Sequence, residues 1–160
     1  MRDTPSPSDA LIFRFKATLL QLNRAICNTL LNKTSRFPVN KRPSIDVILA
    51  ESTTPLWSDG ADAEKYLLAG KIHNLRLALR RLNGVEVPAG GVFSFWTQIG
   101  RASRWKGYVA GRELREGCII PSIGGGLCQL SNALYDAALT AGFEIIERHA
   151  HTRVVPGSLA

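Results

Sequence analysis

The chain has 160 residues, of which 45% are hydrophobic and 21% charged, a balance typical of one soluble globular domain with an added segment. Its three cysteines are an odd number without regular spacing, which does not describe a disulfide framework and favours a reducing compartment. The net charge of +7 is uneven, because residues 1–44 carry eight Lys or Arg against two Asp, whereas residues 45–160 are nearly neutral. A folded part without a basic stripe of interleaved aromatics does not indicate a nucleic-acid partner.

The basic segment contains an apolar, helical pattern at residues 9–32. One face is formed at three- and four-residue spacing by Leu11, Phe15, Leu19, Leu22, Ile26 and Leu30. Arg14, Lys16 and Arg24 interrupt the run, so it is neither a signal peptide nor an uncharged membrane span of about 20 residues. Two interpretations stay open, which are packing against the chain's own domain and peripheral contact with an anionic membrane surface. We expect a cytoplasmic protein, with any membrane contact at the inner face.

A linker and a long helix are predicted next. Residues 36–43 contain two prolines and three basic residues, which is typical of a linker, and a short strand is predicted at Ile45–Ala50. Ser58 or Asp59 is suited to cap a long helix that Asn83-Gly84 would end. The stripe of this helix that faces the core is Leu68, Ile72, Leu75, Leu79 and Leu82.

Short strands are predicted in the middle of the chain. They lie at Val92–Phe95, Tyr108–Leu114 and Gly117–Ile120, and Cys118 in the last of them is expected to be buried. Three aromatic residues are suited to line a groove for a sugar or peptide, although core packing is the favoured interpretation: Trp96, Trp105 and Tyr108.

A second principal helix is predicted at Leu127–Ala141, and Gly142 would end it. The turn before it consists of three glycines: Gly124, Gly125 and Gly126. The apolar stripe of this helix is Leu127, Leu130, Leu134, Ala137 and Ala141. Glycines permit backbone conformations that other residues avoid and allow a backbone or a ligand to approach closely.

Cys128 lies off the apolar stripe, on a neighbouring face with Ser131 and Asn132. A thiol in the first turn of a helix meets unpaired N–H groups and the positive end of the helix dipole. Such a position can lower the pKa of the thiol below its usual value of about 8.5. The same N–H groups are suited to bind an anion or stabilise an oxyanion. The alternative is an ordinary buried cysteine beside a tight turn.

A final strand is predicted at Phe143–Val155 from its alternating pattern. Alternate residues share one face, which would group Glu147, His149, His151 and Arg153. The short connection between helix and strand would bring a histidine close to Cys128. His149 or His151 would then act as general base, oriented by Glu147 or Asn132, while Gln129 and the N–H groups of residues 126–128 would stabilise the oxyanion.

Two other chemistries use the same residues. Cys128, His149 and His151 are ligand types that suit zinc, although their spacing is not a zinc signature. In a non-catalytic binding module, the glycine N–H groups, the histidines and Arg153 would hold a carboxylate or phosphate. The preferred interpretation includes neither a metal nor a cofactor.

Several motifs occur together between Pro88 and Ala160. They are Pro88–Phe95, Ile99-Gly100, Gly107-Tyr108, Gly124–Ser131, Ala133–Ala137 and Glu147–His151. Their combination and order resemble the VanW family, named for an accessory protein of vancomycin-type glycopeptide resistance clusters. The resemblance implies a bacterial protein linked to the cell envelope or peptidoglycan, and it carries no agreed biochemical activity. It also implies that the family domain continues past Ala160, so that this chain is a form truncated at its C-terminus.

The sequence therefore predicts an α+β fold with a single mixed or antiparallel sheet, two main helices and an N-terminal helical extension. Residues 1–44 would form the basic helical segment and linker, and residues 45–160 the VanW-like domain. The expected function is envelope-associated, with a Cys–His cleft that acts on or binds peptidoglycan peptides or precursors. An enzyme would perform thiol-dependent acyl transfer or hydrolysis. The alternatives are a non-catalytic anion- or peptidoglycan-binding module and a zinc protein.

Overall fold

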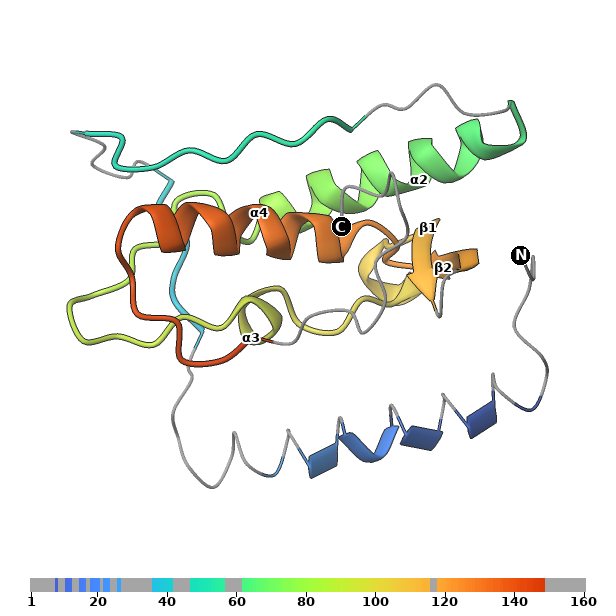
Figure 1. The fold of residues 1–160 in the computed structure, drawn as a ribbon, viewed down its shortest axis with the longest axis horizontal. Coiled ribbons are helices and arrows are strands. Elements are labelled where there is room, and N and C mark those ends of the chain that lie inside the picture. Colours follow the sequence, from blue (N-terminus) through green and yellow to red (C-terminus); the bar gives the residue numbers. More distant parts are fainter. Residues whose placement is uncertain are drawn as a thin grey trace.

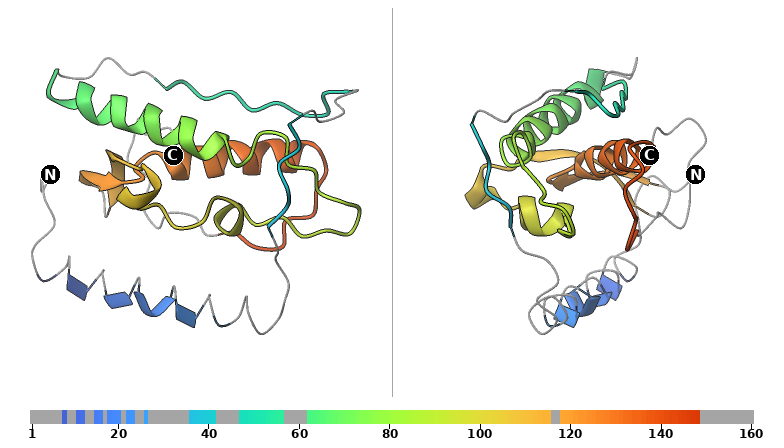
Figure 2. Two further views of the ribbon diagram at one scale, coloured as in Figure 1. Left: turned by 180° about the vertical axis from the view of Figure 1, so that it is seen from behind. Right: turned by 90° about the vertical axis from the view of Figure 1, so that its left-hand side faces the viewer.

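The computed structural model describes residues 8, 11–12, 15–16, 18–20, 22–23, 26, 36–41, 47–56, 62–115 and 118–148. Its elements are α2 (Asp62–Leu79), α3 (Phe95–Ile99), the 3-10 helix η1 (Arg104–Lys106), β1 (Ala110–Arg115), β2 (Cys118–Ile123) and α4 (Leu127–Thr140). α2 packs against β1 and α4, while α3 lies on the side of α4 away from α2 (Figures 1 and 2). The predicted α+β class, with an antiparallel sheet and two main helices, is confirmed.

The core is small and lies where α2 and the first turn of α4 meet. Its buried cluster consists of Ala78, Ile99, Tyr108 and Leu127. The predicted stripe of α2 is buried at Leu68 and Leu75, but Leu79 is 45% exposed. The stripe of α4 is likewise buried at Leu127, whereas Leu134 further along reaches the surface. Both helices therefore bury their apolar stripes over only part of their length.

Asn74 joins α2 to the two segments that carry the sheet and the glycine turn. Its side chain is fully buried, and its Nδ2 donates to the carbonyls of Val109 at 2.9 Å and Gly125 at 3.1 Å. Its Oδ1 accepts from the N–H of Val109 at 2.9 Å. A buried polar group is tolerated when its hydrogen bonds are made, so Asn74 acts as a polar clamp within an apolar core.

The sheet consists of β1 and β2 in antiparallel pairing, from Ala110 opposite Ile123 to Arg115 opposite Cys118. An isolated two-stranded sheet is marginally stable in water, so this one depends on the helix that covers it. The approach of α2 is close, because a Cβ at Gly70 would overlap the carbonyl of Ala110. Glycine at this position of a helix therefore reflects packing rather than helix propensity.

The glycine turn carries the chain from β2 into α4. Gly124 and Gly126 have φ of 85° and 99°, which only glycine adopts readily. Gly125 is buried, and a Cβ there would overlap the backbone of Gly111 in β1. The predicted helix at Leu127–Ala141 is confirmed by α4, which Gly142 follows with a φ of 78°.

Three predicted strands are wrong or incomplete. At Val92–Phe95 the chain forms a loop and then α3, because Ser94 caps that helix by accepting from the N–H of Thr97. Residues 143–148 have no regular structure, and the rest of that predicted strand lies outside the described residues. Residues 47–50 are also irregular. An alternating or apolar pattern supports a strand only where a partner strand is in register beside it.

The predicted N-terminal helix is helical at every described residue from 8 to 26. Its described large apolar residues do not pack on the domain, since they are between 52% and 72% exposed: Leu11, Ile12, Phe15, Leu19, Leu20, Leu22 and Ile26. This segment, called the N-terminal helical segment below, lies apart from α2 and α4 in Figure 1 and in both views of Figure 2. None of the helices in the described part of the chain has the length and hydropathy that crossing a membrane requires.

The predicted linker is instead attached to the domain over residues 36–41. Gln98 is 5% exposed, and its Oε1 accepts from the N–H of Phe37 at 2.9 Å while its Nε2 donates to the Phe37 carbonyl at 3.0 Å. Val39 forms an antiparallel bridge with Val85. The side chain of Gln98 thus bonds both backbone groups of Phe37, as a neighbouring strand would. The two residues are about sixty positions apart, and no local pattern indicates this contact.

Candidate functional site

The site predicted from the sequence centres on the first turn of α4, and the residues around that turn come from distant segments. Part of Cys128 is exposed to solvent. The aliphatic stem of Lys71 on α2 lies against the glycine turn, where a Cβ at Gly126 would overlap it. Glu113 on β1 is close enough to act electrostatically on the thiol. The site therefore joins α2, β1 and α4 beside the thiol.

The electrostatic environment of Cys128 opposes thiolate formation. Burial of the sulfur against its neighbours raises the pKa of the Cys128 thiol, and the negative charge of Glu113 raises it further. Although the residue as a whole reaches the surface, the atoms packed around the sulfur remove water from it. Desolvation and the nearby carboxylate thus shift this pKa in the direction opposite to the one that the helix terminus favours.

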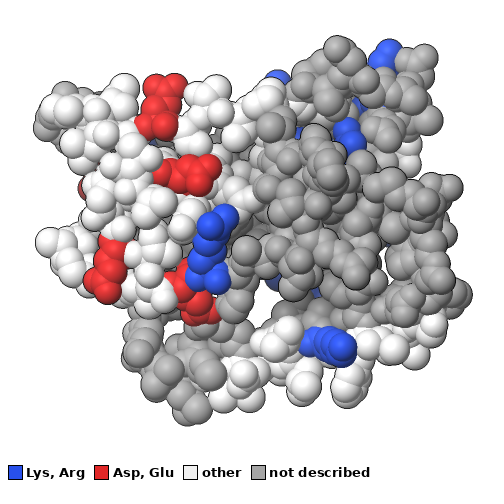
Figure 3. Space-filling model, viewed as in Figure 1, with Lys and Arg blue, Asp and Glu red and all other residues white. Residues whose placement is uncertain are grey.

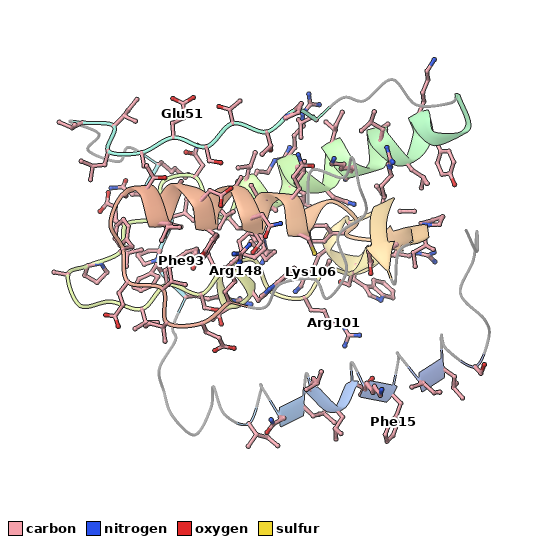
Figure 4. The ribbon with its side chains drawn as sticks, viewed as in Figure 1. Phe15, Glu51, Phe93, Arg101, Lys106 and Arg148 are labelled. Carbon is pink, nitrogen blue, oxygen red and sulfur yellow. The ribbon has the colours of Figure 1, made fainter. Side chains whose placement is uncertain are left out.

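The side-chain amide of Gln129 is hydrogen-bonded to a segment far away in the sequence. Its Nε2 donates to Thr54 Oγ1 at 3.0 Å and to the carbonyl of Pro55 at 3.1 Å. Residues 47–56 have no regular structure and run alongside the helical layer, with Glu51 projecting from them in Figure 4. An amide nitrogen has two hydrogens, and both are used here, so this conformation of Gln129 offers none to an oxyanion.

The N–H groups of the glycine turn are also used in part by the fold. Gly124 donates to the carbonyl of Val109 at 3.1 Å, and Gly125 donates to that of Ser122 at 2.9 Å. The N–H of Leu127 donates to the carbonyl of Gly124 at 3.3 Å. The turn thus satisfies several of its own donors, and a ligand would meet fewer of them than the sequence indicated.

The remaining predicted site residues are only partly placed. Ser131 and Asn132 are half-buried on α4, and Glu147 is exposed on the segment that follows it. The guanidinium of Arg148 lies 4.0 Å from the centre of the Tyr135 ring, which brings residues 143–148 back across α4. His149, His151 and Arg153 lie outside the described residues, so their proximity to Cys128 stays a prediction.

Some residues of the site were not found from the sequence. Lys71, Glu113 and Thr54 carry no motif, and each reaches α4 through tertiary contacts alone. Burial and the adjacent charge of Arg112 lower the pKa of Lys71. For Glu113, the available signal was its charge within the strand predicted at Tyr108–Leu114, because alternate side chains of a strand share one face of the sheet.

The three aromatic residues proposed for a groove have different environments. Tyr108 is 2% exposed and belongs to the core, as favoured from the sequence. Trp96 and Trp105 are instead 53% and 100% exposed, so the favoured interpretation of core packing is wrong for both. Trp96 contacts Phe95 edge to face, with ring centres 4.9 Å apart. These residues do not line one groove with Tyr108.

No group of three or more His, Cys, Asp or Glu residues converges within the described ranges. His73 is exposed, and its Nε2 lies 2.9 Å from the carbonyl of Gly107. On the face shown in Figure 3, acidic side chains gather on the side where α4 ends, with few basic ones between them. The described surface around the end of α4 therefore carries negative charge.

Comparisons with known proteins find the family that the motifs between Pro88 and Ala160 resemble. The family model described as "VanW like protein" matches residues 70–159. The vancomycin B-type resistance protein VanW of Enterococcus faecalis is 31% identical over 108 residues, which are 68% of this chain and 39% of the relative. The uncharacterized protein YoaR of Bacillus subtilis is 36% identical over 84 residues, which are 52% of this chain and 28% of the relative. No solved structure shows significant similarity to the chain.

Proposed function

Since the chain belongs to the VanW family, we propose that it acts at the bacterial cell envelope and binds a peptidoglycan peptide or precursor at the beginning of α4. The chain spans 28% and 39% of the lengths of the two relatives, so an activity of a whole relative is carried over only as part of this proposal. A role in glycopeptide resistance follows from the name of the Enterococcus relative, and it belongs to the same proposal.

The observation that carries the proposal is the attachment of residues 54 and 55 to Gln129. The side-chain amide holds a hydroxyl and a backbone carbonyl of a segment without regular structure. Extended peptides are commonly recognised through hydrogen bonds to their backbone. Beside Gln129 lie the exposed Cys128 and the half-buried Ser131, which offer further contacts to a peptide. Residues 47–56 would then be an internal occupant that a peptide ligand displaces.

A direct test is the binding of a soluble peptidoglycan stem pentapeptide to the full chain, measured by isothermal titration calorimetry. We expect saturable binding that Gln129→Ala weakens at least about tenfold, equivalent to about 1.4 kcal/mol. The matched control is Asn83→Ala, which removes an exposed amide from the turn after α2 and is expected to change nothing. Absence of binding by the unsubstituted chain, or equal losses in both variants, would contradict the proposal.

The alternative is thiol-dependent acyl transfer or hydrolysis with Cys128 as nucleophile and His149 or His151 as base. Its energetic requirement is a thiol that ionises near neutral pH, whereas the described surroundings raise the pKa. The pH dependence of alkylation by iodoacetamide separates the two functions, with Cys27 and Cys118 replaced by serine. The binding proposal predicts an apparent pKa above about 8.5. A lower value that rises when both histidines are replaced by alanine would favour the enzyme.

A further inference from the structure

Trp105 is a large aromatic residue whose exposure the fold does not explain. It lies in the middle of η1 and is 100% exposed, between Arg104 and Lys106. The turn around it is well defined, because Gly107 closes η1 with a φ of 83° and donates to the carbonyl of Arg104. Tryptophan beside basic residues is typical of positions at the interface between a membrane and water, where the ring enters the headgroup layer.

Positive charge converges on Gly100, which lies between α3 and η1. Arg36 Nη2 and Lys106 Nζ lie 3.0 Å and 3.1 Å from the position that a Cβ of Gly100 would occupy. The two nitrogens are therefore no more than about 6 Å apart and repel each other. Within the described part of the chain, Arg36 donates to the carbonyl of Thr97 at 2.9 Å, and Lys106 donates to the carbonyl of Arg101 at 2.9 Å. No carboxylate of a described residue is paired with either of them, and further N–H donors of both remain for an anion.

The N-terminal helical segment supplies the third feature. Its described apolar residues are more than half exposed, and Figure 4 shows Phe15 pointing away from the domain. Residues 1–44 carry eight basic against two acidic residues. An exposed apolar helix face in a strongly basic segment is the pattern of helices that lie in the interface of an anionic bilayer.

These three features lie on the same side of the molecule. The chain from α3 through η1 lies on the side of α4 that faces the N-terminal helical segment in Figure 1, and Arg101 projects toward that segment in Figure 4. We infer that this side, called the basic aromatic side, docks on the surface of an anionic phospholipid membrane. Lipid phosphates would accept from Arg36 and Lys106, while Trp105 and the apolar helix face enter the headgroup layer. The inference is independent of the proposed peptide site.

Charge complementarity favours an anionic occupant, and the exposed apolar helix face together with Trp105 favours a membrane among such occupants. The acidic side chains seen in Figure 3 gather on the side where α4 ends, whereas residues 1–44, which include the N-terminal helical segment and the linker, have a net charge of +6. An anionic surface would therefore attract one side of the protein and repel another, which fixes its orientation. The attraction is expected to fall as salt is added, because exposed charges are screened.

The test uses the full chain and sedimentation with vesicles of phosphatidylcholine, with and without phosphatidylglycerol. We expect binding to the anionic vesicles alone, weakened at least about tenfold by Leu11→Ser/Phe15→Ser/Leu19→Ser. Losses of several-fold are expected for Trp105→Ala and for Arg36→Gln/Lys106→Gln, and Lys106→Arg should restore binding relative to Lys106→Gln. In a chain carrying Trp57→Phe and Trp96→Phe, the fluorescence of Trp105 should shift to the blue on binding.

Matched controls distinguish vesicle binding through the basic aromatic side from nonspecific binding. Val47→Ser/Ile48→Ser/Leu49→Ser removes three apolar side chains that are 73–75% exposed elsewhere, and Arg76→Gln/Arg80→Gln removes two exposed charges from α2 and the turn after it. Both controls should bind vesicles as the unsubstituted chain does. Equal losses in controls and test variants would overturn the inference, as would an absence of binding. A concentration-dependent dimer that Leu11→Ser/Phe15→Ser/Leu19→Ser abolishes, without vesicle binding, would overturn it in favour of a protein interface.

Discussion

Leu127 and Trp105 are both large apolar residues beside tight glycine turns, yet the first is 3% exposed and the second 100%. Around Leu127 the apolar side chains are buried and the polar groups of Asn74 are bonded. On the basic aromatic side, apolar side chains face solvent and neighbouring cations have no carboxylate partner among the described residues. The residues around Leu127 stabilise the fold. The exposed apolar side chains and cations of the basic aromatic side are instead available to a binding partner.

The largest effect is expected at the buried clamp between α2 and the sheet. Asn74→Ala removes the partners of the Val109 N–H and of two carbonyls and leaves a cavity in the core. We expect the free energy of unfolding to fall by about 4 kcal/mol, measured by urea denaturation. Asn83→Ala on the surface is the control, with an expected change below about 0.5 kcal/mol. A loss at Asn74 no larger than that would show that these bonds contribute little.

A pair of substitutions tests the comparison of the two regions directly. Leu127→Ala should destabilise the protein by about 3 kcal/mol because it opens a cavity in the core. Trp105→Ala should change stability by less than about 0.5 kcal/mol, since the ring loses no contacts within the protein. Thermal or urea unfolding of both variants measures the difference. A Trp105 variant as unstable as the Leu127 variant would mean that the aromatic ring packs in the folded protein.

A smaller effect of opposite sign is expected at Tyr108. Its hydroxyl is buried and has no hydrogen-bond partner among the described residues, and burial raises its pKa. Tyr108→Phe removes the unbonded group and keeps the ring, so we expect stability to rise by about 1 kcal/mol. Urea denaturation measures the change. A loss of stability would indicate that the hydroxyl has a partner in solution.

The smallest effect concerns pH. Because the folded state raises the pKa of Cys128, it favours the neutral thiol. The resulting stability is fully present below the unfolded pKa of about 8.5 and is lost as the pH rises through the folded pKa. Cys128→Ser should therefore lose less stability than the unsubstituted chain between about pH 7.5 and 9.5, compared by urea midpoints. Identical losses in both proteins would show that the surroundings do not oppose thiolate formation.

Sequence patterns correctly predicted the features that depend on a single helix, strand or turn. The limits of α4, the positive φ of Gly142 and the pairing strands around residues 110–120 follow from periodicity and turn residues. The same reasoning failed at residues 92–95, where Ser94 caps the helix α3 in place of the predicted strand. It failed at residues 143–148 because an alternating pattern does not specify a partner strand.

The sequence predicted a candidate site at the beginning of α4 and stays the basis for that prediction, but it did not predict the environment of the thiol there. Helix position alone predicts a lowered pKa, whereas the actual direction depends on packing and on Glu113 of β1. Gln129 illustrates the same limit, because Thr54 and Pro55 engage its amide from across the molecule. Contacts between distant segments decide both properties, and no residue spacing encodes them.

The sequence by itself determined the family motifs, the two main helices, the glycine turn and the basic N-terminal helical segment, since these depend on local pattern and composition. Only the tertiary structure decided that Gln98 fastens the linker, that cations converge on Gly100 and that Trp105 remains outside the core. The physical reason is that burial and electrostatic surroundings are sums over neighbours from the whole chain. Local sequence sets which residues are available, and packing sets which of them are covered.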